Sequence, residues 1–272
     1  MKKLILWDLD GTLIDTLEDL GAAVNHALKL RGLPLLGAED FRHMVGHGVR
    51  NLVQQALEEA VSRVGSAATT PEATTSAAPT LRIPASLDDA YIDAALADFK
   101  EFYFAHIDVC TRPYEGMPEL LTELAAAGVK MAVVSNKFQE GTELLVREFF
   151  PDIDFVAILG NRPGWPLKPS PEIVEEVLGR AGVSRAEAIL VGDSPTDMRT
   201  AANGGIDAIA VGWGYRSPEE LAAAGTLEDG TPEASTPEAG TPEAGTPEVD
   251  SSRPPIALTV PELHRLLFQS RC

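Results

Sequence analysis

Residues 4–12 read LILWDLDGT, an apolar run that ends in two acids, Asp8 and Asp10, followed by Gly11 and Thr12. An uninterrupted apolar run is typical of a strand that is covered on both faces of a parallel sheet. Because side chains two positions apart leave a strand on the same side, both carboxylates would face one way. In such sheets ligands bind beyond the carboxyl ends of the strands, where this pair falls. The alternative for this stretch alone is a helix-capping Asp and a turn Asp before glycine.

The second half of the chain alternates between strand and helix patterns. We expect strands over 129–135, 154–160, 186–194 and 206–214, helices over 118–128, 139–150, 170–182 and 195–204, and a short strand with a closing helix over 254–268. This alternation indicates right-handed crossovers and a parallel sheet with helices on both faces. The sequence therefore predicts an α/β fold of the Rossmann-like kind.

A helical region interrupts this pattern directly after the first strand. Apolar residues recur at helical spacing over 16–31, 49–64 and 87–107. We therefore predict a small helical bundle of residues 15–110, inserted into an α/β core of residues 1–14 and 111–272.

Two segments have a composition that does not support packing. Residues 65–86 are rich in Ala, Thr, Ser and Pro, and residues 226–255 repeat the unit TPEA with acidic residues and no aromatic residue. Such segments bury too little apolar surface to order themselves. We expect a flexible loop within the bundle and a disordered linker before the last strand, with partner binding by the TPEA tract as the weaker alternative.

Composition restricts the classes of partner and compartment. The chain has 272 residues, 44% of them hydrophobic, and a net charge of −19, which argues against nucleic-acid binding. No segment approaches the roughly 20 apolar residues of a membrane helix. Cys110 and Cys272 lie far apart and match no metal or redox spacing, which is typical of a reducing compartment. We expect a soluble, cytoplasmic protein.

Polar groups follow three of the later apolar runs. Ser135, Asn136 and Lys137 follow the run KMAVV, and Asp193 and Asp197 follow the run AILV. Lys168 lies between these two groups in the sequence, just before a predicted helix. Each has an ordinary explanation, namely turn chemistry, a surface lysine and a helix cap. Together with Asp8 and Asp10, however, they form a set of oxygen ligands without a His or Cys cluster, which favours a hard cation such as Mg²⁺.

The order and spacing of these residues resemble the haloacid dehalogenase-like hydrolase superfamily. Its four motifs match DLDGT at 8–12, SN at 135–136, Lys168 and GDSPTD at 192–197. The resemblance covers nearly the whole chain apart from the two low-complexity segments. The stretches PYEGMPELLTELAAAGVKMAVVSNK and VGDSPTDMRTAANGG are most similar to phosphoglycolate phosphatase-like members, and the inserted bundle resembles their small helical cap.

The resemblance implies a role for each motif residue. Asp8 would attack phosphorus and form an aspartyl-phosphate, and Asp10 would protonate the leaving oxygen and later activate water. Mg²⁺ would be held by Asp8, the main-chain carbonyl of Asp10 and Asp193, with Asp197 bound to the ion or to one of its ligands. The remaining residues would contact the substrate, Ser135 and Lys168 as catalytic groups and Gly11, Thr12, Asn136 and Lys137 as binding groups, with Thr12 mainly supporting the first motif.

Substrate choice is expected to lie in the cap. The stretch MVGHGVRNLV at 44–53 resembles a substrate-facing loop, and its His47 and Arg50 would contact the substrate, Arg50 through a carboxylate or second phosphate. The alternative is a helix start with a surface arginine.

We therefore expect a Mg²⁺-dependent phosphatase that acts on a small phosphorylated metabolite. A pyrophosphatase, a 5′-nucleotidase and a sugar-phosphate mutase share the same core motifs and stay open. A non-enzymatic binding protein on the same scaffold is disfavoured, because no motif position is degraded. Dehalogenases and phosphonoacetaldehyde hydrolases of the superfamily lack an acid at the position of Asp10, so both are disfavoured. The sequence predicts no particular oligomeric state.

Overall fold

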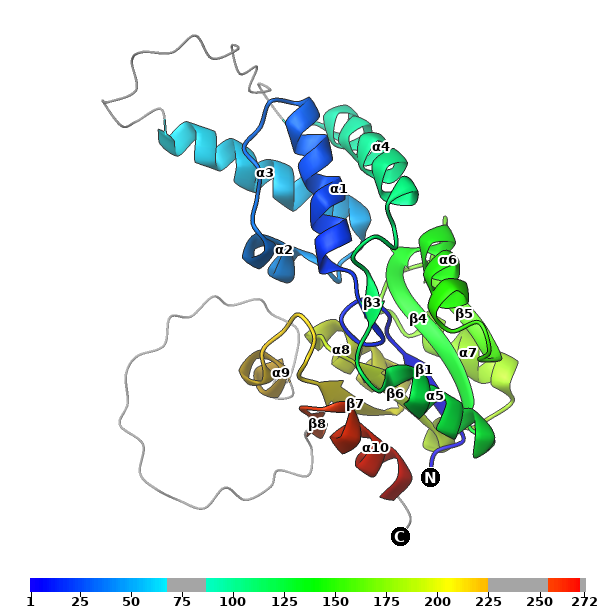
Figure 1. The fold of residues 1–272 in the computed structure, drawn as a ribbon. Helices are drawn as coiled ribbons and strands as arrows, with labels where there is room; N and C mark the ends of the chain where they lie inside the picture. The colour runs from blue at the N-terminus through cyan, green and yellow to red at the C-terminus, as the bar shows by residue number, and fades with distance from the viewer. Residues whose placement is uncertain (68–86, 225–253, 270–272) are drawn as a thin grey trace, which may run out of the picture.

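The core of the protein is a parallel six-stranded sheet. The structure, a computed structural model, describes residues 1–67, 87–224 and 254–269. In these residues the sheet has the order β5-β4-β1-β6-β7-β8, with every pair parallel. The strands are β1 (Leu4–Trp7), β4 (Lys130–Phe138), β5 (Phe155–Asn161), β6 (Ala188–Gly192), β7 (Asp207–Val211) and β8 (Ile256–Ala257). The predicted α/β fold is confirmed, and its first strand lies in the middle of the sheet (Figure 1).

Helices cover both faces of this sheet. Those on one face are α5 (Met117–Ala126), α6 (Gln139–Phe149) and α10 (Val260–Gln269), and those on the other are α7 (Glu172–Ala181) and α8 (Pro195–Gly204), with α9 (Pro218–Ala224) beside α8. In β1, Ile5 and Trp7 pack into the first layer while Leu4 and Leu6 pack into the second. Every residue of β1 is therefore buried, which explains its uninterrupted apolar sequence.

Four helices of the described chain form a second lobe, the cap, at the carboxyl ends of the strands (Figure 1). They are α1 (Leu17–Leu30), α2 (Ala38–Met44), α3 (Val49–Ala67) and α4 (Asp89–Ala105). The three helices expected from the sequence are present with shifted ends. Because α3 continues through Ala67, the first three residues of the segment predicted as a flexible loop are helical. Residues 68–86 and 225–253, which carry the two low-complexity predictions, lie outside the described residues.

Several short elements were not predicted. Helix α2 has seven residues and buries only Phe41 and Met44, so its apolar period is too short to detect. Helix α9 is equally short. The strands β2 (Ile14–Asp15) and β3 (Arg112–Pro113) have two residues each and pair antiparallel where the chain enters and leaves the cap. This ribbon is the neck between the two lobes.

A buried carboxylate joins the two segments of the neck, the one that enters the cap and the one that leaves it. Asp19, in the first turn of α1, accepts hydrogen bonds from the N–H groups of Cys110 (2.9 Å) and Thr111 (2.8 Å) and from the Thr111 hydroxyl (2.8 Å). The segment that returns from α4 is thus bound to the segment that starts α1. Burial removes water from this carboxylate, and the three donors replace it.

A buried arginine binds the cap to the core on the other side. Arg216, in the loop after β7, donates to the main-chain carbonyls of Arg42, His43 (3.0 Å) and Val45 (3.0 Å). These carbonyls lie at the end of α2, where the helix dipole favours a positive charge. The guanidinium therefore holds α2 against the core lobe.

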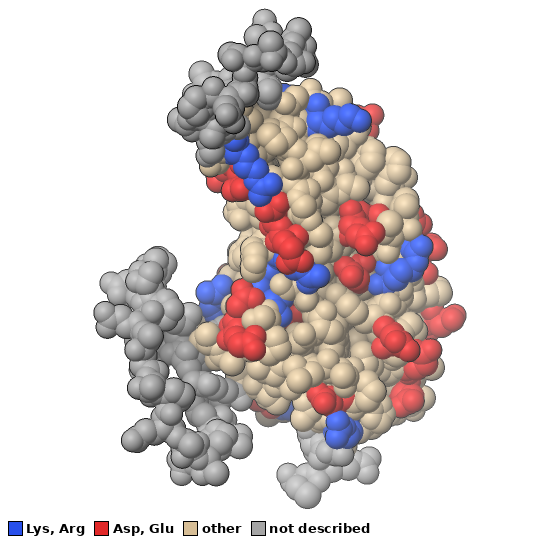
Figure 2. Space-filling model, turned by 60° about the vertical axis from the view of Figure 1, so that its left-hand side comes forward, with Lys and Arg blue, Asp and Glu red and all other residues tan. Residues whose placement is uncertain are grey.

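Charged side chains of both signs lie where the lobes meet. On the face in Figure 2, acidic and basic groups are interspersed between the upper lobe, the cap, and the lower lobe, the core. No helix of the described residues is both long and apolar enough to cross a membrane.

We predict that Asp19→Asn lowers the free energy of unfolding by about 2 kcal/mol, because an amide cannot accept from all these donors and turns its own N–H₂ toward one of them. Urea denaturation followed by circular dichroism measures the change. Asp108→Asn, an exposed change in the same returning segment, is the matched control and should stay within about 0.5 kcal/mol of the original protein. Equal unfolding midpoints for the two variants would contradict the role of Asp19.

Candidate active site

Three carboxylates meet at the carboxyl ends of two adjacent strands. Asp8 directly follows β1, Asp193 directly follows β6, and Asp197 lies in the first turn of α8. Since β1 pairs with β6, the two strand ends are neighbours. All three side chains are buried, and one oxygen of each lies within 4.8 Å of the others.

A lysine lies among these carboxylates. The ammonium of Lys168 donates to Asp8 (2.8 Å), Asp197 (2.6 Å) and the carbonyl of Val134 (2.9 Å). Burial alone would lower the pKa of Lys168, but the carboxylates of Asp197 and Asp8 outweigh it and raise the pKa above its usual value. Its two carboxylate partners thus favour the charged form of Lys168.

One ammonium does not balance three carboxylates. Burial, and then repulsion from Asp197, raises the pKa of Asp8 well above its usual range and that of Asp193 to about 7. A divalent cation would remove this repulsion and favour the charged forms. Buried carboxylate oxygens with a surplus of negative charge are the donor set that a hard cation prefers, so these residues fit Mg²⁺.

The position of Asp193 depends on two glycines. A Cβ atom on Gly11 or on Gly214 would lie 2.3 Å from an Asp193 carboxylate oxygen, so neither position has room for a side chain. The same oxygen accepts the N–H of Tyr215 at 2.7 Å. Asp193 is therefore enclosed between the turn after β1 and the loop after β7.

Asp197 has two structural partners. Its Oδ1 accepts from Lys168, and its Oδ2 accepts from the hydroxyl (2.6 Å) and N–H (3.2 Å) of Ser194. The helix-capping interpretation and the site interpretation of this residue thus both apply. Direct binding of an ion by Asp197 stays a prediction, since both oxygens already accept hydrogen bonds.

Asp10 faces a different set of groups. Among the described residues, the group of three carboxylates does not include Asp10. Its Oδ1 accepts from the Thr16 hydroxyl at 2.8 Å, and its two oxygens lie 3.2 and 3.4 Å from the ammonium of Lys137. Asp10 and Asp8 line the same pocket, so the two acids share a space but have separate partners.

Ser135, Asn136 and Lys137 lie within β4, which continues to Phe138 instead of ending at 135 as predicted. The pairing of β4 with β5 is irregular between Val134 and Phe138, which lets successive polar groups face the site. The Ser135 hydroxyl accepts the N–H of Lys137 at 3.2 Å.

Asn136 bridges the cap and the segment of Lys168. Its amide nitrogen donates to the carbonyls of Gly46 (2.9 Å) and Lys168 (3.1 Å), and its oxygen accepts the N–H of Lys168 (2.8 Å). Asn136 therefore fixes the main chain that carries the lysine and binds a cap loop at the same time.

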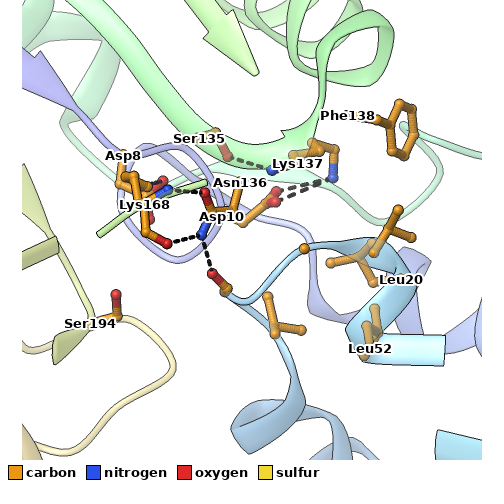
Figure 3. Close-up of a pocket in the computed structure, with 14 residues that line it drawn as sticks. Asp8, Asp10, Leu20, Leu52, Ser135, Asn136, Lys137, Phe138, Lys168 and Ser194 are labelled. Carbon is orange, nitrogen blue, oxygen red and sulfur yellow. Dashed lines mark hydrogen bonds and ion pairs between the residues drawn. The ribbon is translucent and has the colours of Figure 1, made fainter. Parts of the chain in front are cut away.

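The pocket between these groups is small. It has a volume of about 30 Å³, and Leu20, Val45 and Leu52 of the cap form part of its wall. Leu20 and Leu52 lie on the side opposite Asp8 and Lys168 (Figure 3). Such a volume holds about two water molecules. A phosphate ester is larger than this volume.

The other expected substrate residues lie outside this pocket. His47 and Arg50 line a larger cavity of about 680 Å³, which shares Gly48, Val49 and Phe138 with the small one. The guanidinium of Arg50 pairs with Asp89 (2.6 Å) and Asp93 (3.2 Å) of α4. Neither His47 nor Arg50 lines the pocket that Asp8 lines, and their contact with substrate stays a prediction.

Thr12 is fully buried beside the first motif. Its carbonyl accepts the indole N–H of Trp213 at 3.2 Å, and its hydroxyl has no hydrogen-bond partner among the residues that the structure describes. These contacts are structural, and a direct contact of Thr12 with substrate stays a prediction.

Sequence reasoning missed several residues of the site region. They are Thr16, Tyr103, Gly214, Tyr215 and Arg216. The two glycines of GWGYR directly after the last long strand were a signal for a close backbone approach. Tyr103, in an apolar helical stripe, has the pattern of an ordinary core residue.

Comparison with known proteins agrees with this geometry. The sequence profile of the haloacid dehalogenase-like hydrolases matches residues 5–211. The phosphoglycolate phosphatase of Mesorhizobium japonicum is 33% identical over 214 residues, covering 79% of this chain and 84% of the relative. That of Pseudomonas putida is 31% identical over 223 residues, covering 82% and 74%. A crystal structure of a candidate phosphoglycolate phosphatase from Lactobacillus delbrueckii subsp. bulgaricus has a TM-score of 0.75 and 32% identity, covering 98% of this chain and 99% of that one.

The chain belongs to the haloacid dehalogenase-like hydrolase family. Within the family it is a phosphoglycolate phosphatase-like member, and thus a hydrolase of phosphoric monoesters. The resemblance seen in the four sequence motifs is confirmed.

We predict that Gly214→Ala weakens Mg²⁺ binding about 10- to 100-fold, because the added Cβ displaces the Asp193 carboxylate from its position. Isothermal titration with Mg²⁺ measures the affinity directly. The control is Gly179→Ala on α7, where a Cβ meets no atom within 4 Å and which should bind Mg²⁺ as the original protein does. Unchanged affinity in Gly214→Ala would show that Asp193 does not hold the ion.

Proposed function

We propose that the protein is a Mg²⁺-dependent phosphatase that hydrolyses a small phosphomonoester through an aspartyl-phosphate on Asp8. The observation that carries this proposal is the group of Asp8, Asp193 and Asp197 with Lys168 between two of its members. An acid at the tip of a central strand, beside a cation and a pocket, is placed to act as a nucleophile toward phosphorus.

Asp8, Asp193 and the main-chain carbonyl of Asp10 would hold Mg²⁺. When bound, the ion supplies positive charge that reduces repulsion between an anionic nucleophile and an anionic phosphate. Asp8 attacks phosphorus, while Lys168, the Ser135 hydroxyl and the N–H of Asn136 hold the phosphoryl oxygens and their developing charge. Asp197 keeps Lys168 in place through its 2.6 Å ion pair.

Asp10 would provide general acid and base catalysis. It lines the pocket with Asp8 but has its own hydrogen-bond partners, so it can give a proton to the leaving oxygen while Asp8 bonds to phosphorus. The same carboxylate then takes a proton from the water that releases phosphate.

The proposed substrate is 2-phosphoglycolate or a monoester of similar size. The relatives from M. japonicum and P. putida are phosphoglycolate phosphatases. The apolar cap wall of Leu20, Val45 and Leu52 leaves little room beside Asp10, which supports a compact leaving group. For Arg50 to bind a substrate carboxylate, it would have to leave its pairs with Asp89 and Asp93.

We also propose that the enzyme works in the cytoplasm. Cys110 is a free and exposed thiol, which a reducing compartment preserves. Cys272 lies outside the described residues.

The proposal is tested with purified protein, Mg²⁺ and a panel of 2-phosphoglycolate, pyrophosphate, a nucleoside monophosphate and glucose 1-phosphate. We expect phosphate release from 2-phosphoglycolate that EDTA abolishes and that falls at least about 10³-fold in Asp8→Asn, because an amide does not attack phosphorus. The control is Asp152→Asn, at an exposed position between α6 and β5, which should keep full activity.

The other members of the panel decide between the alternatives. Faster turnover of pyrophosphate or of the nucleotide would replace the proposed substrate class. Isomerised sugar phosphate without free phosphate would indicate a mutase. A protein inert toward the whole panel would favour a binding role.

A further inference from the structure

Lys137 is a buried cation whose contacts differ from those of Lys168. Its ammonium donates to the Tyr103 hydroxyl at 2.8 Å. It also lies 3.2 and 3.4 Å from the two oxygens of Asp10 (Figure 3). Lys168, by contrast, bonds Asp8 and Asp197. The two lysines thus pair with different acids, Lys137 with Asp10 and Lys168 with Asp8 and Asp197.

Asp10 is held from its other side as well. The Thr16 hydroxyl donates to Oδ1 of Asp10, and the hydroxyl of Tyr215 lies 3.1 Å from the Thr16 hydroxyl and accepts the N–H of Thr16 at 2.8 Å. Since Lys137 and Thr16 both contact Oδ1, removal of either one leaves the carboxylate with fewer constraints on its rotation. Lys137 supplies the charge-assisted contacts, which are the stronger kind.

Tyr103 belongs to the cap and is itself rigidly packed. It lies near the end of α4, is fully buried, stacks on Phe99 at 5.4 Å and meets the edge of Phe138 at 5.9 Å. Its hydroxyl is therefore fixed relative to α4. The ammonium of Lys137 is placed between this fixed cap atom and the core carboxylate of Asp10.

We propose that Lys137 is a positioning residue for Asp10 and not a ligand of the substrate, and that Tyr103 makes this positioning depend on the cap. The inference rests on the proposed role of Asp10 in proton transfer. With α4 packed as in this structure, Lys137 has both partners and holds Asp10 in one orientation. When the cap moves away, Lys137 loses the Tyr103 hydroxyl and the constraint on Asp10 relaxes.

Two substrates whose leaving groups differ in their need for a proton distinguish positioning of Asp10 from substrate binding by Lys137. Departure of glycolate as an alkoxide from 2-phosphoglycolate requires protonation, which Asp10 supplies. Acetate leaves acetyl phosphate as a stable anion of nearly the same size. Loss of Asp10 positioning should therefore slow the first reaction and spare the second.

The experiment measures the first turnover by rapid quench at saturating substrate for Tyr103→Phe and Lys137→Met. We expect glycolate release to fall about 10-fold in Tyr103→Phe and about 10²-fold in Lys137→Met, with acetate release within about 2-fold of the original protein. Steady-state rates over a range of substrate concentrations give KM, which should be unchanged. Tyr91→Phe, on the same helix but paired with Arg31, is the matched control and should leave both rates unchanged.

Equal losses on both substrates, or a raised KM with kcat preserved, would make Lys137 a substrate ligand or a purely structural residue and overturn the inference. If Lys137→Met does not fold by circular dichroism, Tyr103→Phe decides alone, because it keeps the buried ring. An original protein that releases phosphate from neither ester would refute the proposed function itself. Normal turnover with no leaving-group effect refutes only the positioning role.

Discussion

The structure depends on the ion pairs of one buried ammonium, that of Lys168, with Asp8 and Asp197. Asp8 and Asp197 are close because β1 and β6 are neighbours in the sheet. Lys168 reaches them from the segment between β5 and α7, whose main chain Asn136 of β4 binds. Burying charges is unfavourable unless each finds a partner, so the cluster tolerates little displacement. One cation still leaves negative charge uncompensated, and this surplus explains why the site is suited to a divalent metal ion.

Two side chains of the core bind the cap beside the site. Asn136 in the core donates to Gly46 in the cap, and Tyr103 in the cap accepts from Lys137 in the core. The contacts pair polar groups that would be buried and unsatisfied if the lobes met without them. In the position seen here the cap reduces the pocket to a small volume, which leaves space for only about two water molecules beside Asp8 and Asp10.

The sequence predicted the fold well because the strongest signals were local. The apolar run of β1 and the strand–helix alternation define a parallel sheet, Asp8 and Asp193 directly follow strands, and Asp197 lies in the first turn of a helix. Asp8, Asp193, Asp197 and Lys168 are brought together as the motifs suggest, while their catalytic roles stay predictions. Local patterns carry no information on distant partners. Nothing near Arg50 indicated pairing with Asp89, and nothing in the helical stripe of α4 marked Tyr103 as a partner of Lys137.

The contact of Arg216 with α2 has a consequence for how such a cap can diversify. In the part of the chain that the structure describes, the hydrogen bonds of the Arg216 guanidinium go to carbonyl groups, among them that of Val45, a residue that lines the pocket. Because the interaction is independent of side-chain identity, residues at the end of α2 can be exchanged while the docking geometry persists. Evolution or design can thus exchange the cap residues that line the pocket without changing the contact between Arg216 and the end of α2.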